Sequence, residues 1–285
     1  MLSCVCLSIF EQMSLWWWDM DLMTGNANDI FLPQGYSPLI EGYAAPIRNK
    51  VITEAVVTEV NYRLATSKVT YTKGGTSTTL SGRHVIVTVP LGVLQANSIS
   101  FVPQLPASKR TSINNIGMGK MNKIFMFWNP SDVFWPSDIE LFGDVVDRDV
   151  DFLFINPGSH NDGKPMLFAF FKGEYAESIE SQSNFEDEIS ARAMTALRNM
   201  FGNSIPNPEK VFITRWNADP YTRGAYSYNR IGGRRKERII LGGPIKKKRL
   251  FLSGEATNFR YFQTTHGAYL SGKATALKVT QSLQR

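Results

Sequence analysis

The sequence predicts an α/β protein in which mixed sheets are flanked by helices and arranged in two lobes. Three observations support this prediction. A continuous β-branched run at residues 85–89 ends at a proline, which is typical of a buried parallel strand. Alternation over residues 56–62, with a Lys73-Gly74-Gly75 turn further on, predicts a half-buried strand and a hairpin. An apolar stripe over residues 184–200 predicts an amphipathic helix.

The remaining elements follow in chain order. The pattern over residues 1–45 predicts a helix followed by a loop. Several glycines and prolines interrupt the chain there before a second, apolar helix near Leu39. Residues 151–156 and 166–171 are rich in aromatic side chains and predict strands that floor a cavity. For the helix at 184–200, Asn184 is the expected N-cap and Gly202 the expected residue after its end.

Length and composition predict a protein with a large hydrophobic core, and the few cysteines predict a reducing compartment. The chain has 285 residues, of which 43% are hydrophobic and 12% aromatic. Its two cysteines, Cys4 and Cys6, lie too close in sequence for an ordinary disulfide and form no metal-binding pattern with the three histidines. The first 18 residues lack the basic start and unbroken apolar run of a signal peptide or membrane span. We therefore expect a cytoplasmic protein with no membrane partner.

Basic residues are concentrated in one segment, residues 230–249. Nine basic residues face one acid there, so the segment carries +8 and, with a total of +6, the rest of the chain carries −2. Such a cluster can bind phosphates of nucleic acid or of an anionic membrane. Glycine pairs interrupt the segment, however, and this pattern favours a solvated surface loop over a nucleic-acid site.

The segment of residues 250–274, LFLSGEATNFRYFQTTHGAYLSGKA, predicts a ligand-binding strand-turn-helix unit. Its apolar strand ends at Gly254, and Glu255 then lies at the carboxyl end, where α/β sheets bind cofactors and a carboxylate can accept hydroxyl hydrogen bonds. Thr264 and Thr265 precede a helix that starts with small residues, whose N–H groups favour an anion. This combination suits a flavin. The alternative is a well-capped helix that packs tightly on a strand.

The stretch GEATNFRYFQTTHGAYLSG resembles the carboxy-terminal FAD-binding signature of the flavin-containing amine oxidases. That group holds polyamine oxidases, monoamine oxidases and lysine-specific histone demethylases. Four further blocks resemble the family in the expected order: TEAVVTEVNY, VIVTVPLGVL, GKMNKIFMFW and RWNADPYTRGAYSY. The resemblance covers nearly the whole chain. It implies a partial Rossmann-like FAD lobe at 46–96 and 229–285, and a substrate lobe at 1–45 and 97–228.

The resemblance lacks one family element. Family members begin with a strand, a GxGxxG turn and a helix that hold the FAD pyrophosphate. No GxGxxG occurs in the 285 residues, and Gly117-Met118-Gly119 continues to Asn122 instead of a glycine. We therefore expect a truncated family member that binds FAD weakly and whose missing lobe a second chain could cover. The alternative is a non-catalytic remnant that cannot retain FAD and interacts through its basic surface loop.

Lys123 is the candidate catalytic residue. Alternation in MNKIFMFW places it on one strand face with Met121, Phe125 and Phe127. A buried lysine there would be an amine that can hold a water, whereas an edge-strand lysine would extend to solvent. The resemblance implies the first role, because amine oxidases carry a lysine here that holds a water against flavin N5.

The resemblance also implies the other site residues and the reaction. Expected cofactor-binding residues are Val56, Pro90, Gly92, Trp216, Tyr221, Gly254, Glu255, Thr264 and Thr265, and expected substrate-binding residues are Tyr226 and Thr264. The reaction is oxidation of a small-molecule amine at its C–N bond to an imine, with O2 reduced to H2O2. Thr264 stands where many relatives have a second cage aromatic, which favours the polyamine-oxidase and demethylase branches. Glu11 and Glu174 are weak candidates for recognising a polycationic amine.

Overall fold

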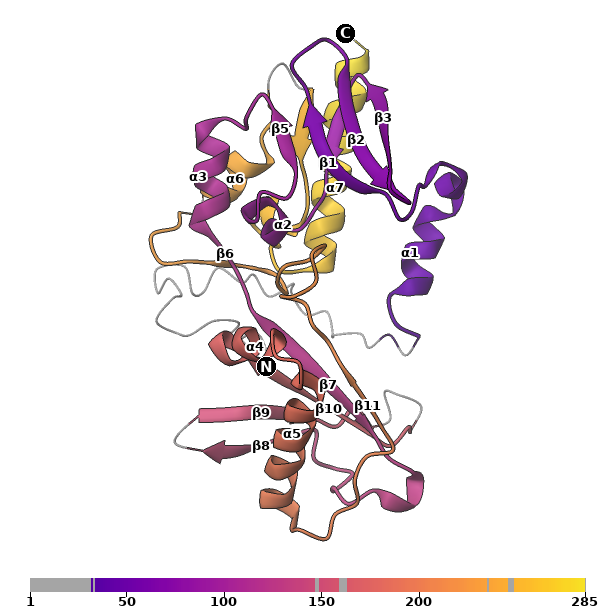
Figure 1. Ribbon diagram of the computed structural model, residues 1–285, viewed down its shortest axis with the longest axis vertical. Coiled ribbons are helices and arrows are strands. Elements are labelled where there is room, and N and C mark those ends of the chain that lie inside the picture. The colour runs from indigo at the N-terminus through magenta and orange to yellow at the C-terminus, as the bar shows by residue number, and fades with distance from the viewer. Residues whose placement is uncertain are drawn as a thin grey trace. The chain divides into compact units, whose positions relative to one another are not determined.

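The computed structural model describes residues 32, 34–146, 149–158, 163–234, 236–245 and 249–284. Helices and several small sheets make up the mixed α/β class that the sequence predicted (Figure 1). The chain divides into two compact units. Among the described residues, unit 1 contains 52–119 and 219–284, and unit 2 contains 32–51 and 120–218.

The division after residues 119 and 218 differs from the expected boundaries after 96 and 228. Strand β6 (Ile116–Met118) pairs antiparallel with β12 (Ser227–Asn229), and helix α3 (Ala107–Asn115) packs against α6 (Lys236–Gly242). These contacts hold both segments, 97–119 and 219–228, in unit 1.

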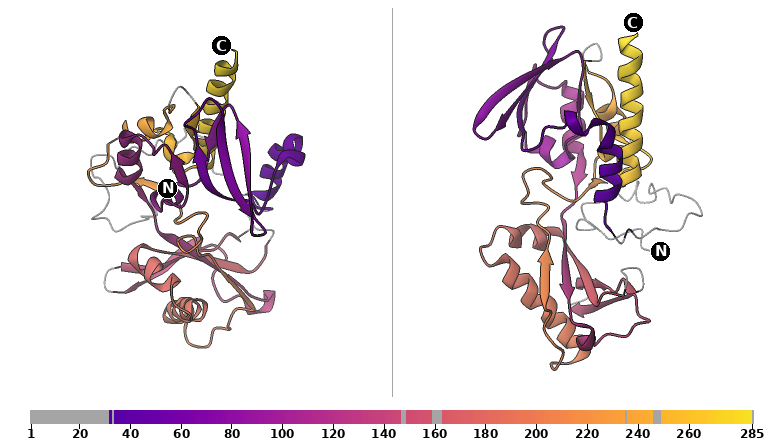
Figure 2. Two further views of the ribbon diagram at one scale, coloured as in Figure 1. Left: turned by 45° about the horizontal axis from the view of Figure 1, so that its top comes forward. Right: turned by 90° about the vertical axis from the view of Figure 1, so that its right-hand side faces the viewer.

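Unit 1 contains a four-stranded sheet in the order β3-β2-β1-β5. Strands β1 (Val56–Asn61), β2 (Ser67–Lys73) and β3 (Thr76–Gly82) are antiparallel and form a twisted ribbon, whereas β5 (Ser100–Val102) runs parallel to β1 (Figure 2). The predicted hairpin is confirmed, because Lys73 pairs with Thr76. Gly74 and Gly75 have φ of 54° and 79°, the left-handed values that a two-residue hairpin turn requires.

The predicted alternation of β1 is wrong at its start. A β-bulge between Val57 and Glu59 shifts the register, so the first half of the strand presents the opposite face from the second. Val56 is therefore 43% exposed, although Val60 on the same predicted face is 1% exposed. A bulge leaves no clear sequence signal in a run of valines.

A second sheet of unit 1 pairs two parallel strands, β4 (Val85–Val87) and β13 (Leu250–Leu252). Both were predicted as interior strands. Every residue of β13 is buried, whereas in β4 Val87 is buried and Ile86 is exposed. Parallel pairing brings their carboxyl ends to the same edge of the sheet. Beyond that edge follow helix α2 (Leu91–Gln95) after β4, and the 3-10 turn η6 (Glu255–Thr257) and helix α7 (Thr265–Leu283) after β13.

The basic segment is not the surface loop that we expected. Its middle is helix α6, in which Arg238 is 2% exposed and Glu237 is 5% exposed. Glu237 accepts a hydrogen bond from Ser112 Oγ at 2.6 Å. Residues 235 and 246–248 lie outside the described part of the chain. Partners for a buried cation come from distant segments, so basic composition alone could not show that one member of the cluster is internal.

Unit 2 contains a five-stranded antiparallel sheet in the order β11-β7-β10-β9-β8. The two predicted aromatic strands are confirmed as β9 (Asp149–Ile155) and β10 (Met166–Lys172). The described part of unit 2 also contains β7 (Met121–Phe127), β8 (Leu141–Val146), β11 (Lys210–Ile213), α1 (Ser37–Ala44), η3 (Ala45–Lys50), η4 (Pro130–Asp132), α4 (Gly173–Glu180) and α5 (Phe185–Phe201).

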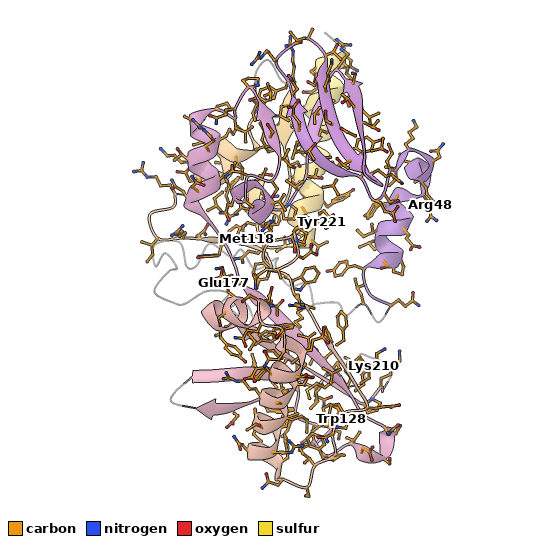
Figure 3. The ribbon with its side chains drawn as sticks, in the orientation of Figure 1. Arg48, Met118, Trp128, Glu177, Lys210 and Tyr221 are labelled. Atoms are coloured by element: carbon orange, nitrogen blue, oxygen red, sulfur yellow. The ribbon has the colours of Figure 1, made fainter. Side chains whose placement is uncertain are left out.

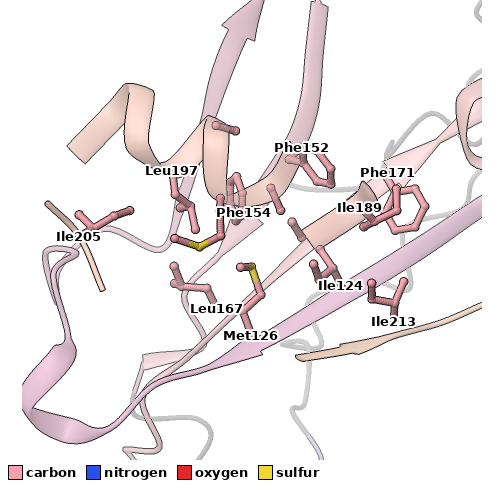
Figure 4. Close-up of a cluster of buried hydrophobic side chains, with 14 of the residues drawn as sticks. Ile124, Met126, Phe152, Phe154, Leu167, Phe171, Ile189, Leu197, Ile205 and Ile213 are labelled. Carbon is pink, nitrogen blue, oxygen red and sulfur yellow. The ribbon is translucent and has the colours of Figure 1, made fainter. Parts of the chain in front are cut away.

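Helix α5 covers one face of this sheet and confirms the predicted amphipathic helix. Ile189 and Leu197 lie on its buried stripe and join Ile124 and Met126 of β7 in the core of unit 2 (Figure 4). The helix ends before Gly202, whose φ of 93° suits glycine. Asn184 occupies the N-cap position, but its side chain makes no capping hydrogen bond.

Several expectations concern residues that the structure leaves undescribed. Cys4, Cys6 and Glu11 lie outside the described residues, as does the side chain of Glu174. Within the described part, no helix has the length and apolar character needed to cross a membrane.

Lys109 is a buried lysine at the contact between α3 and α6. Only 5% of it is exposed, and its Nζ donates to the carbonyl oxygens of Ile240, Leu241 (2.9 Å) and Gly243 (2.5 Å). Ile240 and Leu241 lie in the last turn of α6 and Gly243 directly follows it, so Lys109 supplies a donor to carbonyls at the end of this helix. Burial, together with the nearby charge of Lys278, lowers the pKa of Lys109 to about 8.

We predict that Lys109→Met destabilises unit 1. The substitution keeps most of the volume but leaves three carbonyls without their donor, so the free energy of unfolding should fall by about 2–3 kcal/mol in urea titrations. Lys278→Met is the control. It removes the exposed positive charge that repels Lys109 and leaves the hydrogen bonds of Lys109 in place, so stability should be unchanged or slightly higher. Equal stability of Lys109→Met and the wild type would contradict this role.

Candidate functional site

A small pocket lies in unit 1 where β4 and β13 end. It has a volume of about 200 Å³ and is bordered by the residues that follow both strands, by α7 and by the chain near β6 and β12. Three of the residues predicted to bind the cofactor, Pro90, Gly254 and Glu255, line this pocket. Met118, labelled in Figure 3, and Ala225 close another side. The pocket therefore occupies the position at which parallel sheets bind cofactors.

Glu255 organises this pocket through three hydrogen bonds. Ser227 donates twice, from its backbone N–H to Oε1 at 3.1 Å and from Oγ to Oε2 at 2.7 Å. The backbone N–H of Gln263 donates to Oε2 at 2.8 Å. An ionised carboxylate offers about four lone-pair sites, so room for about one further donor remains. Glu255 can thus serve as a structural clamp and also accept one hydroxyl of a ligand.

Gly254 provides an open surface beside this carboxylate. It has φ of 145°, a value that other residues rarely adopt, and no heavy atom would lie within 4 Å of an added Cβ. Its N–H donates to Ser271 Oγ of α7 at 3.0 Å, which ties the strand end to the helix. A ligand can therefore approach this backbone closely.

The start of α7 is built around Thr264 and Gly267. Thr264 Oγ1 accepts from the N–H of Gly267 at 3.0 Å and donates to the carbonyl of Tyr261 at 2.8 Å. Its hydroxyl is therefore used in capping, a role that the sequence did not assign to it. The following residue, Thr265, is exposed and does not line the pocket.

Other expected cofactor and substrate residues of unit 1 lie elsewhere. Val56 and Gly92 are not among the lining residues. A Cβ on Gly92 would lie 2.3 Å from the carbonyl oxygen of Arg223, so this glycine permits close packing of two backbones. Tyr221 is 62% exposed, whereas Tyr226 is half-buried and its carbonyl accepts from Gly119 N–H at 2.8 Å.

In unit 2, Lys123 lies on the face of the sheet opposite the core. Asn122, Ile124 and Met126 point into the core, whereas Lys123 and Phe125 alternate onto the other, half-buried face. The Nζ atom lies 5.2 Å from the ring centroid of Phe170, and burial lowers the pKa of Lys123. The structure thus places this amine in an apolar setting rather than in open solvent.

Aromatic rings cover the sheet around this lysine. Phe125 stacks on Phe168 with centroids 5.6 Å apart and contacts Phe212 at 6.1 Å, while Phe168 meets Phe170 edge to face at 5.7 Å. Phe212 is 57% exposed, which is unusual for so large an apolar side chain on a sheet. We call Lys123 and these four rings the aromatic face. The alternation of these residues along each strand was visible in the sequence, but the pairing of β7 with β10 and β11 that brings the rings together was not.

A buried carboxylate orders the chain that carries Trp216. Glu180 is 3% exposed and accepts hydrogen bonds from Asn122 Nδ2, from Asn217 Nδ2 at 2.7 Å and from Ala218 N–H at 2.5 Å. Asn122 Oδ1 in turn accepts from Trp216 N–H at 2.9 Å. Trp216, which is 40% exposed, is therefore fixed next to the strand of Lys123. Nothing in the sequence singled out Glu180 or Asn122.

These features belong to a known family. The chain matches the profile of the flavin-containing amine oxidoreductases over residues 3–280, and it is a member of that family. The resemblance seen in the sequence is thereby confirmed.

Curated relatives cover almost all of this chain. "Lysine-specific histone demethylase 1 homolog 1" of Oryza sativa subsp. japonica is 35% identical over 281 residues, which are 96% of this chain and 32% of that protein. "Probable polyamine oxidase 4" of Arabidopsis thaliana is 33% identical over 279 residues, 95% of this chain and 51% of that protein. The chain thus spans about a third to a half of the length of these relatives.

Solved structures share the fold. Putrescine oxidase bound to putrescine superposes with a TM-score of 0.68 at 21% identity, covering 84% of this chain and 51% of that one. Cyclohexylamine oxidase from Brevibacterium oxydans IH-35A gives 0.65 at 21% identity, covering 85% and 51%.

The family implies FAD as cofactor, and the pocket in unit 1 fits part of that molecule. It offers a carboxylate with room for a hydroxyl donor, an open glycine backbone and apolar walls. Its volume of about 200 Å³ is below the range of about 300–1,000 Å³ typical of sites for drug-sized ligands, so these residues would contact only a portion of FAD.

We predict that Gly267→Ala disturbs the loop that serves Glu255. The added Cβ would lie 1.6 Å from the carbonyl oxygen of Tyr261, which forces the backbone before α7 to move. The free energy of unfolding should fall by about 1–3 kcal/mol.

Gly272→Ala in the same helix is the matched control. No heavy atom would lie within 4 Å of its Cβ, so the better helix propensity of alanine should raise stability by up to about 1 kcal/mol. Denaturant titration of both variants checks the contrast, and two equal shifts would refute the packing argument.

Proposed function

We infer that this chain supplies part of the active site of a flavin-dependent amine oxidase that oxidises the C–N bond of an alkyl amine and reduces O2 to H2O2. The observation that carries the proposal is Lys123, an amine of lowered pKa on the aromatic face. Family membership supports a redox role for such a group.

Each unit carries groups suited to a different part of this chemistry. In unit 1, Glu255 would accept a hydrogen bond from a flavin ribityl hydroxyl, and Gly254 would allow close approach of the cofactor. When bound, flavin supplies the oxidising equivalents, taking hydride from the carbon next to the amine nitrogen and passing electrons to O2. In unit 2, Lys123 Nζ would hold a water or a proton, and the rings of the aromatic face would exclude bulk water.

For the substrate we propose an aliphatic polyamine. Aromatic faces attract an alkylammonium group by cation–π interaction, and Phe125, Phe168 and Phe212 present such faces. The names of two similar proteins, a polyamine oxidase and a putrescine oxidase, support this class. The demethylase relatives support a second candidate, a methylated lysine side chain, which is also an alkyl amine.

Further polypeptide would complete the cofactor site. Tyr269, Leu270 and Leu277 of α7 are 39–57% exposed, and Ile86 of β4 is 39% exposed. Strand β4 belongs to a two-stranded parallel sheet, and parallel sheets are normally covered on both faces. We propose that a segment with the family's glycine-rich pyrophosphate turn, which these 285 residues lack, covers this surface, either within a longer chain or as a second chain.

We predict that Lys123→Met slows amine oxidation about a hundredfold while FAD affinity stays unchanged, because a proton-handling group is lost and the cofactor contacts remain. The assay uses saturating FAD with putrescine, and a methyl-lysine peptide in parallel to separate the two substrate classes. In the wild type the rate should rise with pH as Lys123 loses its proton, below the pH of an exposed lysine because burial lowers its pKa. The variant should lose this rise.

Lys210→Met is the control, since Lys210 is an exposed lysine on the adjacent strand β11. It should retain both rate and pH profile. Equal rates and profiles for Lys123→Met and the wild type would remove Lys123 from the site. Failure of the wild type to oxidise either amine with FAD present would favour a non-catalytic protein of this fold.

A further inference from the structure

Arg238 is a buried arginine whose charged group is almost fully removed from solvent. It is 2% exposed, and it lies in α6, behind the turn that carries Glu255. Its guanidinium donates to Ser227 Oγ at 2.6 Å, to Asn229 Oδ1 at 3.2 Å and to the carbonyl of Ala256 at 3.3 Å. Burial of a guanidinium costs free energy unless hydrogen-bond acceptors satisfy its donors, and these three acceptors offset part of that cost.

The contacts of Arg238 converge on the residues that hold Glu255. Ser227 Oγ accepts a hydrogen bond from Arg238 and donates one to Glu255 Oε2 at 2.7 Å, and we call this guanidinium–hydroxyl–carboxylate chain the relay. Arg238 also stacks on Phe262, with 4.0 Å from Cζ to the ring centroid. The next residue, Gln263, has a left-handed φ of 66° and donates its N–H to the same carboxylate.

All three hydrogen bonds to Glu255 therefore come from residues that Arg238 contacts directly or through the neighbouring residue. The arginine orients these donors and places a positive charge one hydroxyl group away from the carboxylate. A hydrogen-bonded charge in a buried network is worth more than an isolated neutral contact.

We propose that Arg238 is a positioning residue for cofactor binding, which orients Glu255 through Ser227 and the Phe262–Gln263 backbone. The proposal rests on the function proposed above for Glu255, and it assigns a role to a residue that the basic composition of residues 230–249 concealed. Arg238 itself does not line the pocket.

FAD titration of the full chain, followed by quenching of flavin fluorescence, tests this role. Arg238→Met should weaken binding about tenfold to a hundredfold, the loss expected for a charged hydrogen bond. Arg238→Lys keeps a cation and should restore affinity to within about threefold. Arg234→Met, the same change at an exposed arginine before α6, should bind like the wild type.

If Arg238 acts through Glu255, the effects of replacing the two residues on FAD affinity should not add. In a Glu255→Gln background, Arg238→Met should cause no further loss of FAD affinity, because the carboxylate that it positions is already replaced. Additive losses, or an Arg238→Met chain that binds FAD like the wild type, would overturn the proposal. If Arg238→Met does not fold, Ser227→Ala, which breaks only the relay, replaces it and should show the same epistasis.

Absence of FAD binding by the wild type would instead refute the proposed function of Glu255, and the relay is then decided without flavin. Free energies of unfolding for Arg238→Met, Glu255→Gln and the double variant should be non-additive, whereas the Arg234→Met and Glu255→Gln pair should be additive. Additivity in the first cycle would overturn the relay itself.

Discussion

The carboxylate of Glu255 is the interaction on which the site in unit 1 depends. It follows β13 closely and accepts hydrogen bonds from β12 and from the loop before α7, so one side chain joins three segments of unit 1. The strained backbone of Gln263 and the Thr264 cap of α7 both lie in that loop. The shape of the pocket where β4 and β13 end therefore follows from this charged group and from the arginine behind it.

Unit 2 depends on a different constraint, the alternation of side chains between the two faces of its sheet. One face packs with helix α5 in the hydrophobic core of unit 2, and the period-two alternation of β7 places Lys123 on the other face. There the ammonium loses solvation, and burial lowers the pKa of Lys123. A strand that builds a core on one side thus presents a reactive amine on the other.

The sequence predicted those elements whose signals are local. The run at Leu250–Leu252, the glycine turn after Lys73 and the stripe of α5 each follow from periodicity or turn chemistry over a few residues. The sequence could not show that a bulge turns Val56 outward or that Arg238 is internal. Each of these depends on a partner brought by the fold from elsewhere in the chain.

The position of a flavin ribityl chain in crystals of this protein grown with FAD tests the account most directly. The account predicts a ribityl hydroxyl oxygen within about 3 Å of the Glu255 carboxylate, in addition to the donors from Ser227 and Gln263. FAD bound elsewhere, or a Glu255 that contacts only Ser227 and Gln263 beside an ordered flavin, would contradict it.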